Sequence, residues 1–390
     1  MGRCKAVLNL TVVFASMVGL AGCTSFNRED PLANYTLPGE LPAEKGMLTQ
    51  FTEGLMASAR DSVGLGPNEE IAQRHFDDAM AIYQEASRLE GKARTKRYEE
   101  AAKLFGNAAT RWPSSSIEED SLFFQGESYF FADRCPKAES FFGTVISKYP
   151  STKYIENISQ RRFQIAKYWL DHHEATGSLS ITPNFTAKER PTFDSFGNAI
   201  KVLERIRLDD PTGELADDAT MLAATACYEV GKIYRADELL SDLRRSFPNS
   251  KHQYDAHMIG LQCKIQLYQG PSYDAGPLDD AEHLVKQMQR QFPQEAREDL
   301  PFLTKASKDV RMNRAIRDWN LAKYRDRRKE YGAARIQYER VAKEFSDTSL
   351  AQSAKTRLAD LGGKPDLPPQ RLEWLAKAFP TEDAEKPLLR

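Results

Sequence analysis

Apolar residues recur along this chain in steps of four, three and four, and one clear example ends at Pro113. Counted back from that proline, positions minus twelve, minus eight, minus five and minus one are Ala101, Phe105, Ala108 and Trp112. These steps place the four residues on one face of a helix, and such a face packs into a core. The proline then ends the helix, because it lacks an amide hydrogen and clashes with the preceding turn.

The same pattern recurs along the chain. An alanine lies twelve residues before each of five prolines, and another lies twelve before Ser346, where a sixth proline would stand. These alanines are Ala101, Ala138, Ala199, Ala236, Ala281 and Ala334. Only a small side chain lets two helix backbones approach closely, so we expect all six at buried helix crossings. The chain is therefore a repeat array.

Each alanine helix is preceded by a second helical segment with a tyrosine near its end. The tyrosines are Tyr83, Tyr129, Tyr168, Tyr228, Tyr268 and Tyr324. No run of alternating β-branched residues indicates a sheet. We expect an all-α domain of two-helix units over residues 69–361, in which 349–361 form a capping helix. Ser116 with Glu119 and Ser250 with Gln253 have capping-box spacing and predict two helix starts.

A Gly-x-x-Tyr in the first helix and an alanine, an aromatic residue and a proline in the second resemble the tetratricopeptide repeat, whose period is about 34 residues. Gly126 to Tyr129 shows the first of these signatures best. The resemblance implies a right-handed α-solenoid of about six TPR-like helix-turn-helix repeats. Two departures stand out: surplus residues at 171–193, which predict a projecting inserted loop, and a long charged leading helix at about 308–329.

The ends of the chain are predicted to lie outside the repeats. Residues 1–22 have the layout of a secretory signal, and Leu20-Ala21-Gly22-Cys23 resembles the lipobox of a bacterial lipoprotein. That resemblance implies cleavage before Cys23 and acylation of its thiol and new amine; a plain signal peptide is the alternative. Thr24 follows, so the inner-membrane aspartate signal is absent, which implies the outer membrane. Residues 23–68 are predicted to be a flexible tether, and 362–390 a proline-rich tail that docks on the array or binds a partner.

The net charge and the cysteines narrow the classes of function that this chain can have. The 54 basic and 56 acidic residues nearly cancel, so no large field favours nucleic acid. Cys135, Cys227 and Cys263 are predicted to be core thiols rather than members of a bridge.

The candidate metal ligands are few. Asp171-His172-His173-Glu174 is clustered, but adjacent helical residues point about 100 degrees apart, which predicts a solvated helix end. Asp279 and His283 are interpreted as surface residues. No nucleophile, phosphate-loop or metalloprotease motif occurs, so we expect no enzyme, no metal and no cofactor.

Three basic stretches remain as candidates for binding. They are Arg161-Arg162, Arg244-Arg245 and Arg325-Asp326-Arg327-Arg328-Lys329. Each is either a solvated helix face or a grip for acidic segments of a partner.

A lipobox, a tether and repeats of the form Tyr-x-x-Ala, Phe and Tyr-Pro-x-Ser/Thr together resemble the BamD family, tetratricopeptide lipoproteins of outer-membrane β-barrel assembly. Residues 329–334, with Tyr338, Val341 and Phe345, are similar to that family's final repeat. The resemblance implies a periplasm-facing scaffold that holds a barrel-assembly subunit and unfolded clients. No partner-contacting residue can be transferred. Two alternatives stay open: a scaffold for peptidoglycan or envelope processes, and an enzyme with a site under the 171–193 loop.

Overall fold

The structure of the protein is a computed structural model that describes residues 66–177 and 183–368. The chain divides into residues 1–66 and 67–390, and the description below concerns the second unit. Cys23, the signal segment, nearly all of the tether and the tail beyond residue 368 lie outside the described residues. Within the described ranges, no helix combines the length and the hydropathy needed to cross a membrane.

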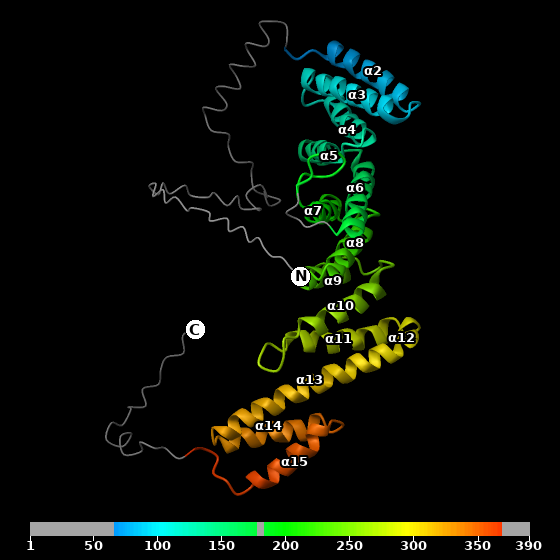
Figure 1. The fold of residues 1–390 in the computed structure, drawn as a ribbon. Helices are drawn as coiled ribbons and strands as arrows, with labels where there is room; N and C mark the ends of the chain where they lie inside the picture. Colours follow the sequence, from blue (N-terminus) through cyan, green and yellow to red (C-terminus); the bar gives the residue numbers. More distant parts are fainter. Residues whose placement is uncertain (1–65, 178–182, 369–390) are drawn as a thin grey trace, which may run out of the picture. The chain divides into compact units, whose positions relative to one another are not determined.

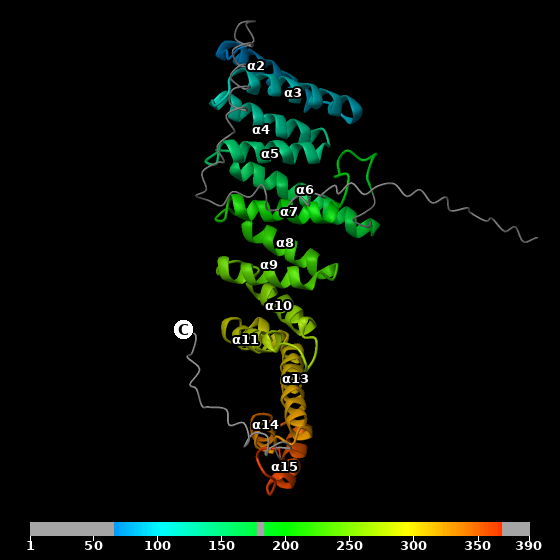
Figure 2. The same ribbon diagram turned by 90° about the vertical axis from the view of Figure 1, so that its left-hand side faces the viewer.

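The second unit is built from helices that follow one another in chain order (Figure 1). They are α2 (Glu69–Ala86), α3 (Gly91–Arg111), α4 (Ser116–Phe131), α5 (Cys135–Lys148), α6 (Ile155–Thr176), α7 (Ser195–Asp209), α8 (Ala216–Glu229), α9 (Ile233–Ser246), α10 (Gln253–Leu267), α11 (Gly276–Gln291), α12 (Glu295–Glu298), α13 (Leu300–Arg327), α14 (Tyr331–Glu344) and α15 (Ser349–Leu361). Consecutive helices pack against each other, as Figure 2 shows for α2 to α9. No strand occurs at 66–177 or 183–368. The predicted all-α helical-repeat fold is confirmed.

The six repeat alanines have the burial that the pattern predicts. Ala101, Ala138, Ala199, Ala236, Ala281 and Ala334 are each 0% exposed. They lie on α3, α5, α7, α9, α11 and α14, the second helices of the six pairs. The residues at minus one behave differently. Trp112, Tyr149, Phe247 and Phe292 are half-buried C-cap residues that have left helical geometry, so they close the helix instead of extending its core face.

Both predicted capping boxes are wrong in detail. The first observed cap lies one residue before the predicted one. The Ser115 hydroxyl accepts a hydrogen bond from Glu118 N at 3.2 Å, and Glu118 Oε2 accepts one from Ser114 N at 2.8 Å. At the second, α10 starts without a side-chain cap, and the Gln253 side chain donates to Phe247 O at 2.7 Å. Gln253 therefore closes the end of the preceding helix instead of its own start.

The first residues of the predicted inserted loop are helical. Helix α6 continues through residues 171–176, and Gly177 ends it with a φ of 57°. In the described part, 183–193, the Asn184 side chain donates to Ala187 O at 2.6 Å and to Arg190 O at 3.2 Å. Trp169 of α6 donates its indole N–H to Glu189 O at 2.9 Å. The described part of this segment therefore contacts α6.

The buried residues of the described ranges form one large and four smaller clusters along the second unit. The large cluster spans Ala109 to Cys263 and includes residues of every helix from α4 to α10. Cys135, Cys227 and Cys263 are buried and unbridged, which confirms the predicted core thiols. Burial raises the pKa of Cys135 and of Cys263 to about 12, so both thiols stay protonated near neutral pH.

Helix α13 is longer than predicted and joins two of the smaller clusters. It starts at Leu300, not near residue 308, and its 28 residues run from α12 to α14 (Figure 1). Its first half buries Leu303, Ala306 and Val310 against α11, whereas its second half buries Ala315, Asp318 and Ala322 near α14. At about 100° per residue the two buried faces differ by roughly 120°. The helix therefore changes its buried side near residue 312.

The first residues of the predicted tail dock on α14. Gly332 N donates to Asp366 O at 3.0 Å, and Arg335 donates to Leu361 O at 2.9 Å and Lys364 O at 3.0 Å. The Arg335 guanidinium also pairs with the Asp366 carboxylate. Of the two roles predicted for the tail, docking applies to residues 362–366.

Candidate partner-binding surface

The histidines of 171–174 do not form a joint site. The His172 ring contacts the Arg190 guanidinium, while the His173 ring lies 5.1 Å from the Phe196 ring. Burial and the Arg190 charge lower the pKa of His172. A guanidinium beside the ring nitrogen opposes a bound cation, and the two histidines point to different neighbours.

Two other sets of potential metal ligands have protein partners. Asp279 Oδ1 lies 3.5 Å from Arg314 Nη2. In the described part of the chain, one set of three ligand atoms lies within 4.8 Å, from Asp217, Asp218 and His252. Lys251 Nζ and His252 Nε2 approach Asp218 Oδ1 at 2.8 and 2.5 Å. Although burial opposes it, these hydrogen bonds lower the pKa of Asp218. The pairing accounts for this set without an ion.

The first basic stretch is internal. Arg161 donates to both carboxylate oxygens of Glu127 at 2.8 and 2.9 Å. Arg162 is 1% exposed and bridges three helices, since it donates to Glu139 of α5 at 2.9 Å and to Asp209 of α7 at 2.5 Å. Its charge is neutralised inside the protein and cannot reach a partner.

The last basic stretch divides into paired and unpaired residues. Arg325 and Arg328 share Glu330 at 2.7 and 2.9 Å, and Asp326 accepts from Arg357 at 2.7 and 3.0 Å. Arg327 is exposed and makes no ion pair with any described residue. Of this stretch, Arg327 is the guanidinium free to bind a partner.

Arg327 belongs to a larger exposed set, which we call the α13 surface. Its members line a cavity of about 580 Å³ between residues 271–273 and α13: Tyr273, Arg317, Leu321, Lys323, Tyr324 and Arg327. Tyr273 is 60% exposed, Tyr324 45% and Leu321 40%, so the apolar part of the cavity faces solvent. Neither Arg317 nor Lys323 has an ion-pair partner in the described ranges.

The periodicity of α13 places these side chains together. At about 100° per residue, the α13 members from Arg317 to Arg327 cover roughly half the circumference of the helix. Ala315 and Ala322 are buried on the opposite side. Of these cations, the basic stretch at 325–329 contains Arg327 but neither Arg317 nor Lys323. The spacing of Arg317, Leu321, Tyr324 and Arg327, at steps of four, three and three, is the signal that points to Arg317.

A second cavity lies along the same helix. Its volume is about 500 Å³, and Trp319, Tyr338 and Arg357 line it. Lys323 and Arg327 line both cavities, so they stand on the ridge between them. Exposed aromatic side chains beside unpaired cations are the composition that protein interfaces favour, because the rings bury large areas at low entropic cost. The α13 surface is suited to a protein segment that carries acidic and apolar side chains.

Comparison with known proteins agrees with this description. Residues 186–360 match the family model YfiO, described as an outer membrane lipoprotein. The matched range includes α7 to α14, the α13 surface and nearly all of α15. No curated protein matches the chain. The family match confirms the predicted resemblance to BamD-like lipoproteins over these residues.

Proposed function

We propose that this protein is a lipid-anchored scaffold of outer-membrane β-barrel assembly that binds a partner protein through the α13 surface. The proposal is supported by the BamD-like match over residues 186–360 and by the helical-repeat fold. In this role the protein binds and positions other proteins and performs no catalysis. The α13 surface is the observation that carries the proposal, because its cations make no ion pair with any described residue and its aromatic rings are exposed.

The anchor in this proposal is Cys23, acylated after signal cleavage. Two or more acyl chains hold a protein on a bilayer stably, whereas one does not. The Cys23→Ser variant should therefore appear in the soluble fraction of the cell envelope after osmotic release. Unchanged membrane association of this variant would place the anchor elsewhere.

Site-specific photocrosslinking tests the partner. A benzophenone amino acid placed at Tyr324 should crosslink to a subunit of the barrel-assembly machinery in intact cells. Tyr234 on α9 is the matched control, since it is 71% exposed but lies outside the α13 surface. Crosslinks from Tyr324 to cell-wall enzymes would support the peptidoglycan role instead. Equal crosslinking from both positions would show that the α13 surface is not the specific binding site.

Charge reversal gives a second readout of the same surface. The Lys323→Glu and Arg327→Glu double variant should weaken partner binding at least tenfold, because two cations on the shared ridge become repulsive. Its unfolding midpoint should stay near that of the parent, since neither residue makes an ion pair within the described chain. Unchanged co-purification of the partner would contradict the proposal.

A further inference from the structure

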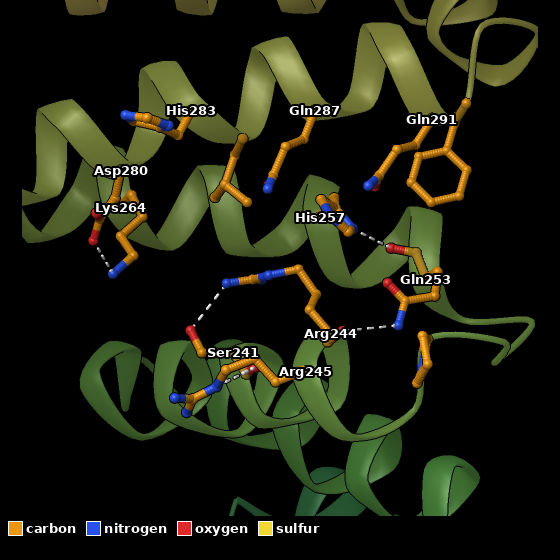
Figure 3. A pocket seen from close by; sticks show the side chains of 13 residues that line it. Ser241, Arg244, Arg245, Gln253, His257, Lys264, Asp280, His283, Gln287 and Gln291 are labelled. Atoms are coloured by element: carbon orange, nitrogen blue, oxygen red, sulfur yellow. Dashed lines mark hydrogen bonds and ion pairs between the residues drawn. The ribbon is translucent and has the colours of Figure 1, made fainter.

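A separate cavity of about 630 Å³ lies between α9, α10 and α11 (Figure 3). Arg244 extends into it from α9, His257 lies on α10, and Gln287 and Gln291 extend from α11 toward the same space. Pro248, Leu284 and Phe292 add apolar lining. Volumes of this order are typical of sites that hold a small ligand or a short peptide segment.

Arg244 is held in place by neutral groups. Its guanidinium donates to Ala256 O at 2.7 Å and to Ser241 Oγ at 2.9 Å. It also crosses Gly260 so closely that a Cβ at that position would overlap Nη1. Burial lowers the pKa of Arg244, although the charges of Asp237 and Asp280 act in the opposite direction.

The other cations of the cavity are neutralised. Lys264 Nζ lies 3.0 Å from Asp237 and 2.7 Å from Asp280. Arg245 pairs with Asp242 at 2.7 Å. No described carboxylate pairs with Arg244, and the charges of Asp237 and Asp280 act on it only from a longer range. Of the three cations that line the cavity, Arg244 alone is left to bind an anion.

His257 and the glutamines of α11 are neutral lining groups. His257 is 4% exposed, and its Nδ1–H donates to Gln253 O at 2.7 Å. Burial lowers the pKa of His257, so the ring is neutral near pH 7. The amide groups of Gln287 and Gln291 can donate to or accept from a peptide backbone. Besides its ion-paired side chains, the cavity therefore combines the Arg244 guanidinium with amides and an apolar wall.

We propose that this cavity binds a carboxylate carried by an extended peptide, with Arg244 as the charged anchor and the glutamines of α11 on the peptide backbone. One uncompensated guanidinium suits a monoanion, and its planar donor pair fits the two oxygens of a carboxylate. A phosphate dianion would require more positive charge than the cavity holds. The site is distinct from the α13 surface, so the proposal goes beyond the function proposed above.

Peptide binding to the full chain in detergent tests this proposal. Three fluorescein-labelled peptides share the sequence Gly-Ser-Leu-X-Leu-Ser-Gly: X is Glu with an amidated end, Gln with a free carboxyl end, or Gln with an amidated end. Fluorescence polarisation should show at least one carboxylate peptide binding about tenfold more tightly than the neutral one, because a hydrogen bond to a charged group contributes on that order. The peptide that binds tightly identifies a side-chain or a chain-end carboxylate as the source.

Two variants test whether the preference for a carboxylate arises in this cavity. Arg244→Gln should reduce the affinity for the tighter-binding peptide to the affinity for the neutral peptide. Gln287→Glu adds a negative charge beside Arg244 at an exposed position and should do the same without disturbing the fold. Gln289→Glu is the matched control on α11, exposed but outside the cavity, and should leave affinity unchanged. Equal affinity of all three peptides, or a carboxylate preference that survives in both Arg244→Gln and Gln287→Glu, would overturn the proposal.

Discussion

The region from α4 to α10 and the region from α11 to α15 use the same repeat but differ in how the repeats are joined. In the first, buried residues form one cluster from Ala109 to Cys263, and Arg162 links α5, α6 and α7 inside it. In the second, the buried residues form two clusters, and α13 turns from one to the other. Its ion pairs lie near the surface, such as Arg311 with Asp347.

The two regions also differ in the role of their basic side chains. In the α4 to α10 region, the carboxylates of Glu139 and Asp209 neutralise Arg162, so this charge contributes to stability and not to partner binding. In the α11 to α15 region, Arg317, Lys323 and Arg327 are exposed on the side of α13 opposite Ala315 and Ala322, and they make no ion pair with any described residue. Repeat arrays distribute their stability over neighbouring contacts, so the two regions should respond separately to substitution.

The largest expected effect is at Arg162. Arg162→Ala removes a buried cation and leaves Glu139 with only the exposed Arg205, which should lower the free energy of unfolding by about 3 kcal/mol. Arg317→Ala, at an exposed position without an ion pair to any described residue, should change it by less than about 0.5 kcal/mol. Urea denaturation measures both. Similar losses for the two variants would erase the contrast between the regions.

A smaller effect should stay within the C-terminal region. Ala334→Leu inserts three carbon atoms at a fully buried crossing and should destabilise α14 and its neighbours by about 1–3 kcal/mol. Ala333→Leu, on the exposed side of the same helix, is the control. Hydrogen exchange should show faster exchange from the second half of α13 to α15 and unchanged exchange in α4 to α10. Faster exchange throughout would mean that the regions unfold as one unit.

The smallest effect concerns pH. The hydrogen bonds from Arg357 lower the pKa of Asp326 despite its burial. Because the folded pKa lies below the unfolded value of about 3.9, this pair stabilises α13 against α15 above that pH and loses its contribution as pH falls through the folded pKa. The contribution should be about 1 kcal/mol or less.

The Asp326→Asn variant provides the test of that pH dependence. Hydrogen exchange of α15, corrected for the intrinsic rate, should accelerate more between pH 6 and pH 3 in the parent than in Asp326→Asn. An identical acceleration in both proteins would show that this carboxylate does not couple α13 to α15.

Much of the fold follows from local patterning. The spacing of Ala236, Leu240 and Leu243 predicts a buried helix face, and all three side chains are 0% exposed. This works because a helix has a fixed period and each repeat packs mainly on its neighbours. The family resemblance came from the same repeats and is matched over residues 186–360.

The exposure and pairing of the candidate site residues do not follow from local patterning. Arg162 and Arg327 occupy similar basic stretches, yet one is buried between three helices and the other is exposed. The residues that decide this, Glu139 and Asp209, lie 23 and 47 positions from Arg162. A pattern read within one helix carries no information about charges that approach from another.

The sequence by itself determined the repeat, the buried alanines and the all-helical class, because helix periodicity and the size of a side chain act over a few residues. Only the tertiary structure decided where α13 changes its buried side, that the segment at 183–193 packs on α6, and which cations keep a partner. Those outcomes depend on contacts between distant segments, whose free energies are settled by the packing of several helices at once.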